Sequence, residues 1–296
     1  MLPSLRLRRP TSAVEAGRPQ EAVVLSGGGS LGAAQVGMLR ALYEAGIRPD
    51  LFVGCSVGAL NAAFLAVNPT AERLDDLERV WRALDRGDVF GRTTRLSSTQ
   101  TLLRAVRRDD HLYEPDALRH LVRTWVPVKD LGDTAVPCHV VTTDLVSGLP
   151  CWWSDGDPVA VLTASACLPA LFPPVALGGS LHVDGGVTAP VPIERALDLG
   201  AVRVWVLDVS GGTLGRRDER MTALDVLLQS FAISRAHLDR PVTGMRPDQQ
   251  VIRLRRPDLG RMEMRDFSQT PRVMAAGYAV AREALALASL PAPRTG

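Results

Sequence analysis

The sequence has few cysteines and carries its charges in near balance, and each feature argues against a class of protein. The 34 lysines and arginines are opposed by 32 aspartates and glutamates, which gives a formal net charge of +2. A charge this small does not indicate a nucleic-acid partner, so none is expected. Nearly all of the positive charge is arginine, because Lys129 is the only lysine.

The four cysteines form no metal-binding or redox motif. They are Cys55, Cys138, Cys151 and Cys167, with no C-x-x-C pair and no histidine at the spacing of a metal site. We therefore expect buried, reduced thiols and no metal ion.

Long apolar runs are also missing. The best candidate for a membrane span, Met274 to Leu290, carries Arg282 and Glu283 near its middle. The first residues hold arginines among scattered leucines and prolines, without the apolar segment of a secretory signal. We expect a cytoplasmic protein and leave peripheral contact with a membrane surface open.

Apolar residues are plentiful, at 46% of the chain, and they follow an alternation of strands and helices. An arm of residues 1–19 is rich in Arg, Pro and Gly. An apolar run, Ala22–Leu25, then leads through glycines into a helical pattern from Ala33 to Ala45. A second run, Leu51–Val53, leads through another glycine turn into a helix from Ala59 to Val67. This order predicts an α/β fold with a mainly parallel sheet.

The rest of the chain continues the pattern with less definition. Helical periodicity dominates residues 70–126. Beyond it we predict strands at His139–Thr142, Leu181–Val183 and Val202–Val209, and helices at Leu224–Leu238 and Pro271–Leu290.

The most specific motif is G-x-S-x-G at Gly54–Gly58, between the second strand and its helix. In that context the serine sits on a sharp turn, which the flanking Gly54 and Gly58 tolerate because they lack Cβ. The hydroxyl then projects at a helix N-terminus, where unpaired amides favour negative charge. Ser56 is the predicted nucleophile.

The glycine run that ends at Gly32 predicts an oxyanion site. Acyl transfer creates a negatively charged oxygen that needs preorganised N–H donors, and a glycine loop can present backbone amides. Gly27, Gly28 and Gly29 are the candidate donors, with Gly32 supporting the loop.

The same run also fits the dinucleotide pattern G-x-G-x-x-G. That site requires an acidic residue at the end of the second strand, where this chain has Gly54-Cys55-Ser56. Asp50 precedes the strand and lies at its wrong end. The dinucleotide interpretation is therefore disfavoured.

A serine nucleophile needs a base, and Asp184 is the predicted one. It ends a predicted strand and is followed by Gly185 and Gly186, which let the backbone turn away from the carboxylate. Of the histidines only His237 follows Asp184 in the chain, and it lies within a helical pattern. His182 shares a strand face with Asp184 and is expected to be a packed strand residue.

These segments together resemble the patatin-like phospholipase family. The resemblance covers roughly residues 20–210, in family order. It is carried by the stretches GGGSLGAAQVGMLRALYEAGIRPDLFVGCSVGALNAAFLA and TASACLPALFPPVALGGSLHVDGGV, and by Thr143-Asp144-Leu145 with Ser147-Gly148. Many family members have Arg or Lys where this chain has Leu31.

The resemblance implies a three-layer α/β/α sandwich and a patatin-like acyl hydrolase domain over residues 20–296. It further implies a Ser56–Asp184 dyad without histidine, an acyl-enzyme intermediate and no metal or organic cofactor. The expected substrates are lipid or other acyl esters, as for a phospholipase A or lysophospholipase. Two alternatives remain: an acyltransferase that uses the same serine, and a non-catalytic interaction or dinucleotide-binding module.

Overall fold

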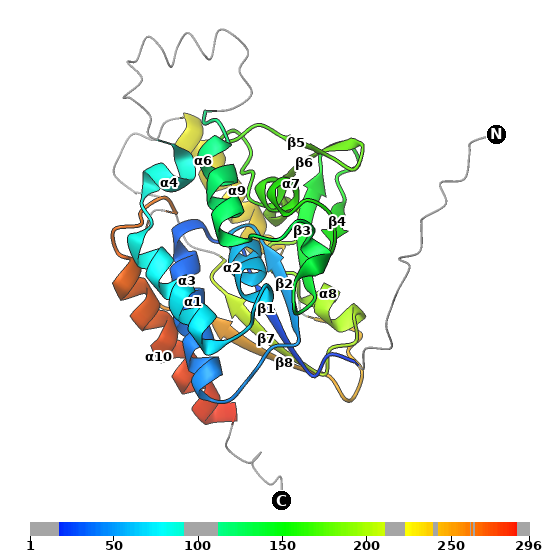
Figure 1. Ribbon diagram of the computed structural model, residues 1–296, viewed down its shortest axis with the longest axis vertical. Helices are drawn as coiled ribbons and strands as arrows, with labels where there is room; N and C mark the ends of the chain where they lie inside the picture. The colour runs from blue at the N-terminus through cyan, green and yellow to red at the C-terminus, as the bar shows by residue number, and fades with distance from the viewer. Residues whose placement is uncertain are drawn as a thin grey trace, which may run out of the picture.

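A mainly parallel sheet of eight strands lies at the centre of the computed structural model, which describes residues 18–91, 112–210, 223–238, 242–260, 262 and 264–288 (Figure 1). Five strands run parallel, in the spatial order β3-β2-β1-β7-β8. They are β1 (Glu21–Leu25), β2 (Leu51–Cys55), β3 (Cys138–Asp144), β7 (Arg203–Asp208) and β8 (Gln250–Arg255). The other three, β4 (Pro150–Trp153), β5 (Val175–Leu177) and β6 (Ser180–Asp184), pair antiparallel.

The strand registers bring the ends of β2 and β6 together. Val141 of β3 pairs with Cys55 of β2 and with β4, and Thr142 pairs with Asp184 of β6 and with β4. A strand residue has one neighbour on each side, so β2 and β6 lie on the same side of β3, opposite β4. Because β2 and β6 run in opposite directions, their carboxyl ends meet beside consecutive residues of β3.

Helices cover both faces of the sheet, as predicted. Val23 and Leu25 of β1 pack into the larger core, and Ala22 and Val24 point into a second, smaller core. The larger core includes side chains of α1 (Gly32–Glu44), α2 (Val57–Ala66), α3 (Ala71–Ala83) and α10 (Thr270–Ala288), and the smaller one includes those of α8 (Ile193–Asp198). Successive side chains of a strand therefore point alternately to the two helical layers.

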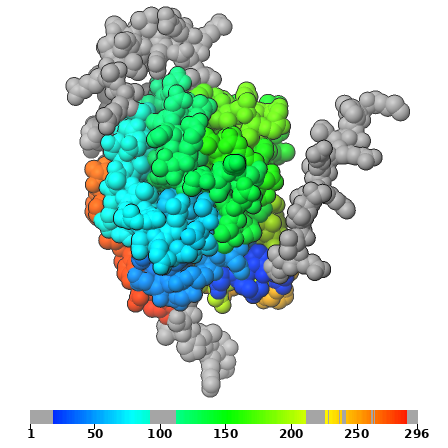
Figure 2. All heavy atoms as spheres, in the orientation of Figure 1, coloured from blue at the N-terminus to red at the C-terminus, as the bar shows by residue number. Residues whose placement is uncertain are grey.

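The remaining elements border these layers. They are α4 (Arg86–Phe90), α6 (Asp116–Trp125), α7 (Pro158–Ser165), α9 (Ala223–His237) and the short 3-10 helices η1 (Gly29–Leu31), η2 (Leu131–Asp133) and η3 (Gly185–Val187). In the space-filling view the cyan and green segments, which include α3, α6 and α7, form a continuous surface (Figure 2). Part of the helical pattern predicted for residues 70–126 falls on residues 92–111, outside the described chain.

The C-terminal helix α10 lies along α1, and two glycines permit this contact (Figure 1). A Cβ on Gly37 of α1 would run into the carbonyl oxygen of Met274, and a Cβ on Gly277 of α10 would run into that of Ala34. Close approach of the two backbones fixes α10 against the first helix of the chain.

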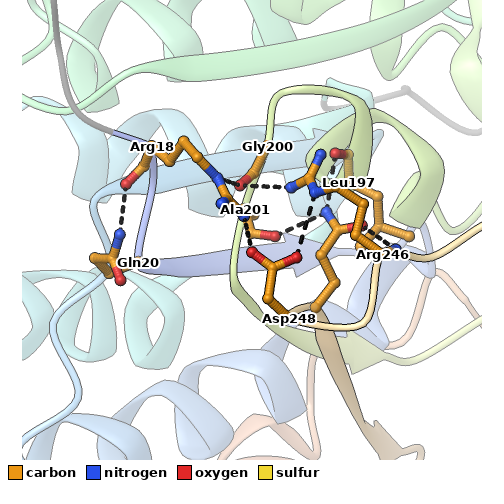
Figure 3. Close-up of polar contacts among 8 residues, drawn as sticks. Arg18, Gln20, Leu197, Gly200, Ala201, Arg246 and Asp248 are labelled. Carbon is orange, nitrogen blue, oxygen red and sulfur yellow. Dashed lines mark hydrogen bonds and ion pairs between the residues drawn. The ribbon is translucent and has the colours of Figure 1, made fainter.

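The chain is tied to the sheet from Arg18 onward, two residues before the predicted domain boundary. Arg18 donates to Asp248 at 2.6 Å and to the carbonyl of Gly200 at 3.2 Å, and Arg246 donates to the same carbonyl (Figure 3). The rest of the predicted arm, residues 1–17, lies outside the described chain. Within the described residues no helix combines the length and the apolar composition that a bilayer span requires.

Candidate active site

Ser56 occupies the sharp turn between β2 and α2. Its backbone has φ 55° and ψ −127°, a conformation that residues with a side chain seldom adopt and that costs on the order of 1–3 kcal/mol. The flanking glycines are needed for close packing. A Cβ on Gly54 would lie 2.5 Å from Cα of Ala59, and one on Gly58 would run into the carbonyl oxygens at the end of β1. The predicted elbow is present, with α2 beginning directly after Ser56.

Ser165 holds this strained turn in place. The amide of Ser56 donates to Oγ of Ser165 at 3.0 Å, and the Ser165 hydroxyl donates to the carbonyl of Val141 at 2.7 Å. Ser165 is fully buried at the end of α7. The turn is therefore fastened to β3 through one side chain.

Asp184 ends β6 and lies within hydrogen-bond reach of Ser56. The Ser56 hydroxyl donates to Oδ2 of Asp184 at 2.7 Å, and the amide of Gly186 donates to Oδ1 at 2.7 Å. Thr143 donates to the Asp184 carbonyl at 3.0 Å, which fixes the backbone. Gly185 is required here, because a Cβ at that position would collide with the carbonyl of Val141. The side chains predicted to be nucleophile and base thus lie within hydrogen-bond distance of each other, and their catalytic roles remain predictions.

The carboxylate of Asp184 is fully buried, and burial raises its pKa above the usual range of an aspartate. The positive charge of Arg235 and the hydrogen bonds from Ser56 and Gly186 act in the opposite direction. An aspartate with a raised pKa is a stronger base than an exposed one, which suits proton transfer from a serine.

The glycine loop after β1 presents two amides for which the described chain supplies no acceptor, those of Gly28 and Gly29. The amide of Gly27 donates to the carbonyl of Pro190 at 3.1 Å. The predicted set of oxyanion donors is therefore narrowed to Gly28 and Gly29. Gly29 has φ 61°, and a Cβ there would lie 2.5 Å from the carbonyl of Met264, so the loop conformation requires glycine.

A series of hydrogen bonds between buried polar side chains holds both ends of the glycine loop. Gln35 donates to the carbonyl of Ser26 at 2.8 Å, and Asn61 donates to Gln35 at 3.0 Å and to the carbonyl of Gly32 at 3.1 Å. Trp81 donates to Oδ1 of Asn61 at 2.8 Å. Gly32 is packed tightly here, since a Cβ would lie 2.5 Å from Val57. These hydrogen bonds join the helices α1, α2 and α3 next to the two glycine turns.

None of the four described histidines is hydrogen-bonded to the serine or the carboxylate. His237 is exposed near the end of α9. His182 is buried, shares a 3.0 Å hydrogen bond with Thr142 and packs its ring against Trp153, as expected of a packed strand residue. His120 is exposed, and His139 faces Arg195. His111 lies outside the described residues.

Among the described residues, the fold brings together one group of potential metal ligands that sequence spacing did not reveal. Ligand atoms of Asp144, Cys151 and His182 lie within 4.8 Å of one another where β3, β4 and β6 pair. Asp144 already accepts hydrogen bonds from Ser180 and from backbone amides, which lower its pKa to about 2. The prediction of a buried thiol was wrong for Cys151, which is half-buried. The other three cysteines are buried and unbridged, as predicted.

A pocket opens beside the glycine loop, and Arg235 lines it. Gly27, Gly28 and Leu31 contribute one side, and Met262 and Met264 contribute apolar surface. Arg235 could not be identified from the sequence, because an isolated arginine in a helix is normally exposed to solvent.

Comparison with known proteins finds similarity over the segment that carries these residues. A family model described as patatin-like phospholipase matches residues 23–197. Patatin-like phospholipase domain-containing protein 7 of Rattus norvegicus is 30% identical over 200 residues, 67% of this chain and 14% of that protein. An uncharacterized NTE family protein of Mycobacterium tuberculosis is 28% identical over 212 residues, 72% of this chain and 53% of that protein. The chain thus spans only a small part of the rat protein and about half of the mycobacterial one.

Among solved structures, VipD from Legionella pneumophila matches with a TM-score of 0.48 and 15% sequence identity. The match covers 92% of this chain and 67% of that chain.

Proposed function

This chain belongs to the patatin-like phospholipase family, and on that basis we propose that it hydrolyses acyl esters of lipids with Ser56 as nucleophile and Asp184 as base. The observation that carries the proposal is the 2.7 Å hydrogen bond from the Ser56 hydroxyl to the buried Asp184 carboxylate. The strained serine backbone and the tight glycine contacts support it, because strain of this kind is retained where function requires it.

In the first half of the proposed reaction, Oγ of Ser56 attacks the ester carbonyl carbon. Asp184 takes the serine proton as the new C–O bond forms, and the carbonyl oxygen becomes an oxyanion. The amides of Gly28 and Gly29 would donate to that oxygen. When the tetrahedral intermediate collapses, the bond to the leaving alkoxide breaks and Asp184 returns the proton to it. The acyl group is then esterified to Ser56.

The second half repeats the sequence with water. Asp184 accepts a proton from the water molecule as its oxygen attacks the acyl carbon. Collapse of the second tetrahedral intermediate breaks the bond to Ser56, and the proton returns to the serine oxygen. The products are a carboxylic acid and the regenerated enzyme, and all the proton transfers use one carboxylate.

We infer that the chain from residue 20 onward forms one acyl hydrolase domain. Both cores include side chains of β1 and β2, and α10 packs on α1, so the C-terminal helix belongs with the first strands and helices. The proposed substrates are lipid or related acyl esters, the compounds that the family name implies.

Labelling with a fluorophosphonate probe tests the proposal. An activated serine should form a covalent adduct that peptide mass spectrometry locates at Ser56, and the Ser56→Ala variant should not react. Ser165→Ala keeps the nucleophile but removes its brace, so labelling should be slower and still occur at Ser56. A folded wild-type protein that remains unlabelled, and that releases no fatty acid from lipid esters, would refute the proposal.

A further inference from the structure

Arg235 is a buried arginine, and one of its nitrogens has no hydrogen-bond partner among the described residues. The residue lies on α9 and is only 8% exposed. Among the described residues no acceptor is found for Nη2. A buried charge is costly unless it is paired and hydrogen-bonded, so this nitrogen invites an anionic ligand.

The guanidinium of Arg235 lies beside the two residues of the proposed dyad. A methyl group on Gly27 would be 2.6 Å from Nη2 of Arg235 and 3.2 Å from Cβ of Ser56. A methyl group on Gly186 would be 3.0 Å from the guanidinium carbon. The arginine therefore fills space between two glycines that flank the serine and the carboxylate.

Asp184 does not satisfy this arginine through a hydrogen bond. Its two oxygens accept from the Ser56 hydroxyl and from the Gly186 amide, and no described hydrogen bond joins it to Arg235. The interaction between the two charges is electrostatic only. Nη2 is thus a buried donor without an acceptor among the described residues, and an anionic group of the substrate would supply that acceptor.

The pocket in front of Arg235 has the chemistry of a site for an amphipathic anion. Arg256 also lines it, and no carboxylate is found among its described lining residues. Leu31, Met262 and Met264 supply apolar surface next to the two arginines. Cationic groups at an apolar wall fit a ligand with one negatively charged group and one aliphatic part.

We propose that Arg235 binds a phosphate group in this pocket and thereby favours phosphate-bearing acyl esters over neutral ones. The inference rests on the proposed hydrolase function and names the feature of the substrate that the site recognises. A guanidinium matches phosphate oxygens with parallel N–H donors, and the resulting charge-assisted hydrogen bonds are strong. Arg235 lies outside residues 23–197, so the family match does not assign this role.

The turnover test compares two substrates that differ only in the phosphate-bearing head group, 1-palmitoyl lysophosphatidylglycerol and 1-palmitoylglycerol. Arg235→Met should lower kcat/KM for the lysophospholipid by about tenfold to a hundredfold, the usual range for a lost charge-assisted contact. Any effect of the lost charge on Asp184 is shared by both esters, so the ratio of the two kcat/KM values should still fall by about tenfold or more. Arg235→Lys should restore part of the preference, because it keeps the charge but not the planar fork.

The control is Arg123→Met, which removes an exposed arginine on α6. This variant should retain the wild-type ratio of the two kcat/KM values. An equal loss on both esters for Arg235→Met would assign the arginine to the shared transition state or to folding and would overturn the proposal. An equal gain would mean that the side chain merely obstructs the serine, and would overturn it as well.

A binding test works even if the chain hydrolyses neither ester. Inorganic phosphate should raise the Tm of the Ser56→Ala protein, and the shift should disappear in the Ser56→Ala, Arg235→Met double variant. A Tm shift that depends on Arg235, together with equal turnover of the two esters, would support the anion site but would identify its ligand as free phosphate. The proposed preference for phosphate-bearing esters would then be wrong. Identical responses of the two proteins to phosphate, combined with an unchanged ester preference, would contradict the site itself.

Discussion

Replacing Asn61 by alanine should destabilise the protein more than any comparable change on its surface. Asn61 is fully buried and joins Gln35 on α1 to Trp81 on α3. Alanine would leave the indole N–H of Trp81 and Oε1 of Gln35 without partners. The carbonyl of Gly32 would lose the Asn61 amide but keep its helical hydrogen bond.

The expected loss of stability follows from these two unsatisfied polar groups. Each unsatisfied buried group costs about 1–3 kcal/mol, and the better helix propensity of alanine returns roughly 0.5 kcal/mol. The expected loss in the free energy of unfolding is therefore about 2–5 kcal/mol. Domains are typically stable by about 5–15 kcal/mol, so the variant should still fold at room temperature.

Urea denaturation followed by circular dichroism measures this loss. Asn68→Ala, at an exposed position just after α2, is the matched control and should change stability by less than about 0.5 kcal/mol. Trp81→Phe should show coupling with Asn61→Ala in a double-mutant cycle, because both remove the same hydrogen bond. A loss below about 1 kcal/mol for Asn61→Ala would refute the role given to this polar chain.

Three further predictions concern the loop, the C-terminal helix and the carboxylate. Gly28→Ala places a Cβ 2.8 Å from Val209 and should shift the loop amides, lowering kcat about a hundredfold with little change in Tm; full activity would move the oxyanion site elsewhere. Gly277→Leu should lower the free energy of unfolding by about 1–3 kcal/mol or more in urea denaturation, whereas Ala279→Leu on the exposed face of α10 should not. Burial raises the pKa of Asp184, so kcat/KM should fall with decreasing pH at an inflection above about 4, and a profile that is flat down to pH 4 would exclude Asp184 as the base.

The same shift in pKa has a consequence for stability with a definite sign. A carboxylate whose folded-state pKa is raised costs stability when it is ionised, at pH values above that pKa. Asp184→Asn removes the charge, and its amide oxygen can accept from the Gly186 amide while its NH2 group donates to the Ser56 hydroxyl oxygen. The inactive variant is therefore expected to be at least as stable as the wild type at pH 8.

The central features of the site could be predicted because they are local in the sequence. The strand, glycine turn and helix around Ser56 occupy one continuous segment, and Asp184 is followed at once by its two glycines. What joins the two residues is a tertiary feature, the end-to-end meeting of β2 and β6 beside β3. The chain order alone could place them on one sheet, and the motif resemblance supplied the pairing.

Elements that lack a distinct apolar pattern were missed. β8 was not predicted because arginines interrupt its apolar residues, and Arg253 is accommodated by an ion pair with Asp208 on the neighbouring strand at 2.6 Å. β4 and β5 are short and partly exposed, and α8 has only six residues. The register of the sheet, rather than local propensity, stabilises these short strands.

Residues that act through tertiary contacts were equally out of reach. The Gly27 amide donates a hydrogen bond to Pro190, which lies in a loop far along the chain. Arg235 reaches the site from α9, and its helix carries no motif that would distinguish it from a surface helix. The cluster of Asp144, Cys151 and His182 arises only when antiparallel strands pair.

Turnover of one chromogenic ester by four variants tests the dyad most directly, with circular dichroism to confirm that each is folded. Asp184→Asn keeps the shape of the side chain and removes the base, so it should abolish turnover almost as fully as Ser56→Ala. His182→Asn and His237→Asn should lower activity modestly, because the first packs against Trp153 and the second is exposed near the end of α9. If His237→Asn were as inactive as Ser56→Ala while Asp184→Asn kept its activity, the enzyme would use a histidine base and the Ser56–Asp184 mechanism would be wrong.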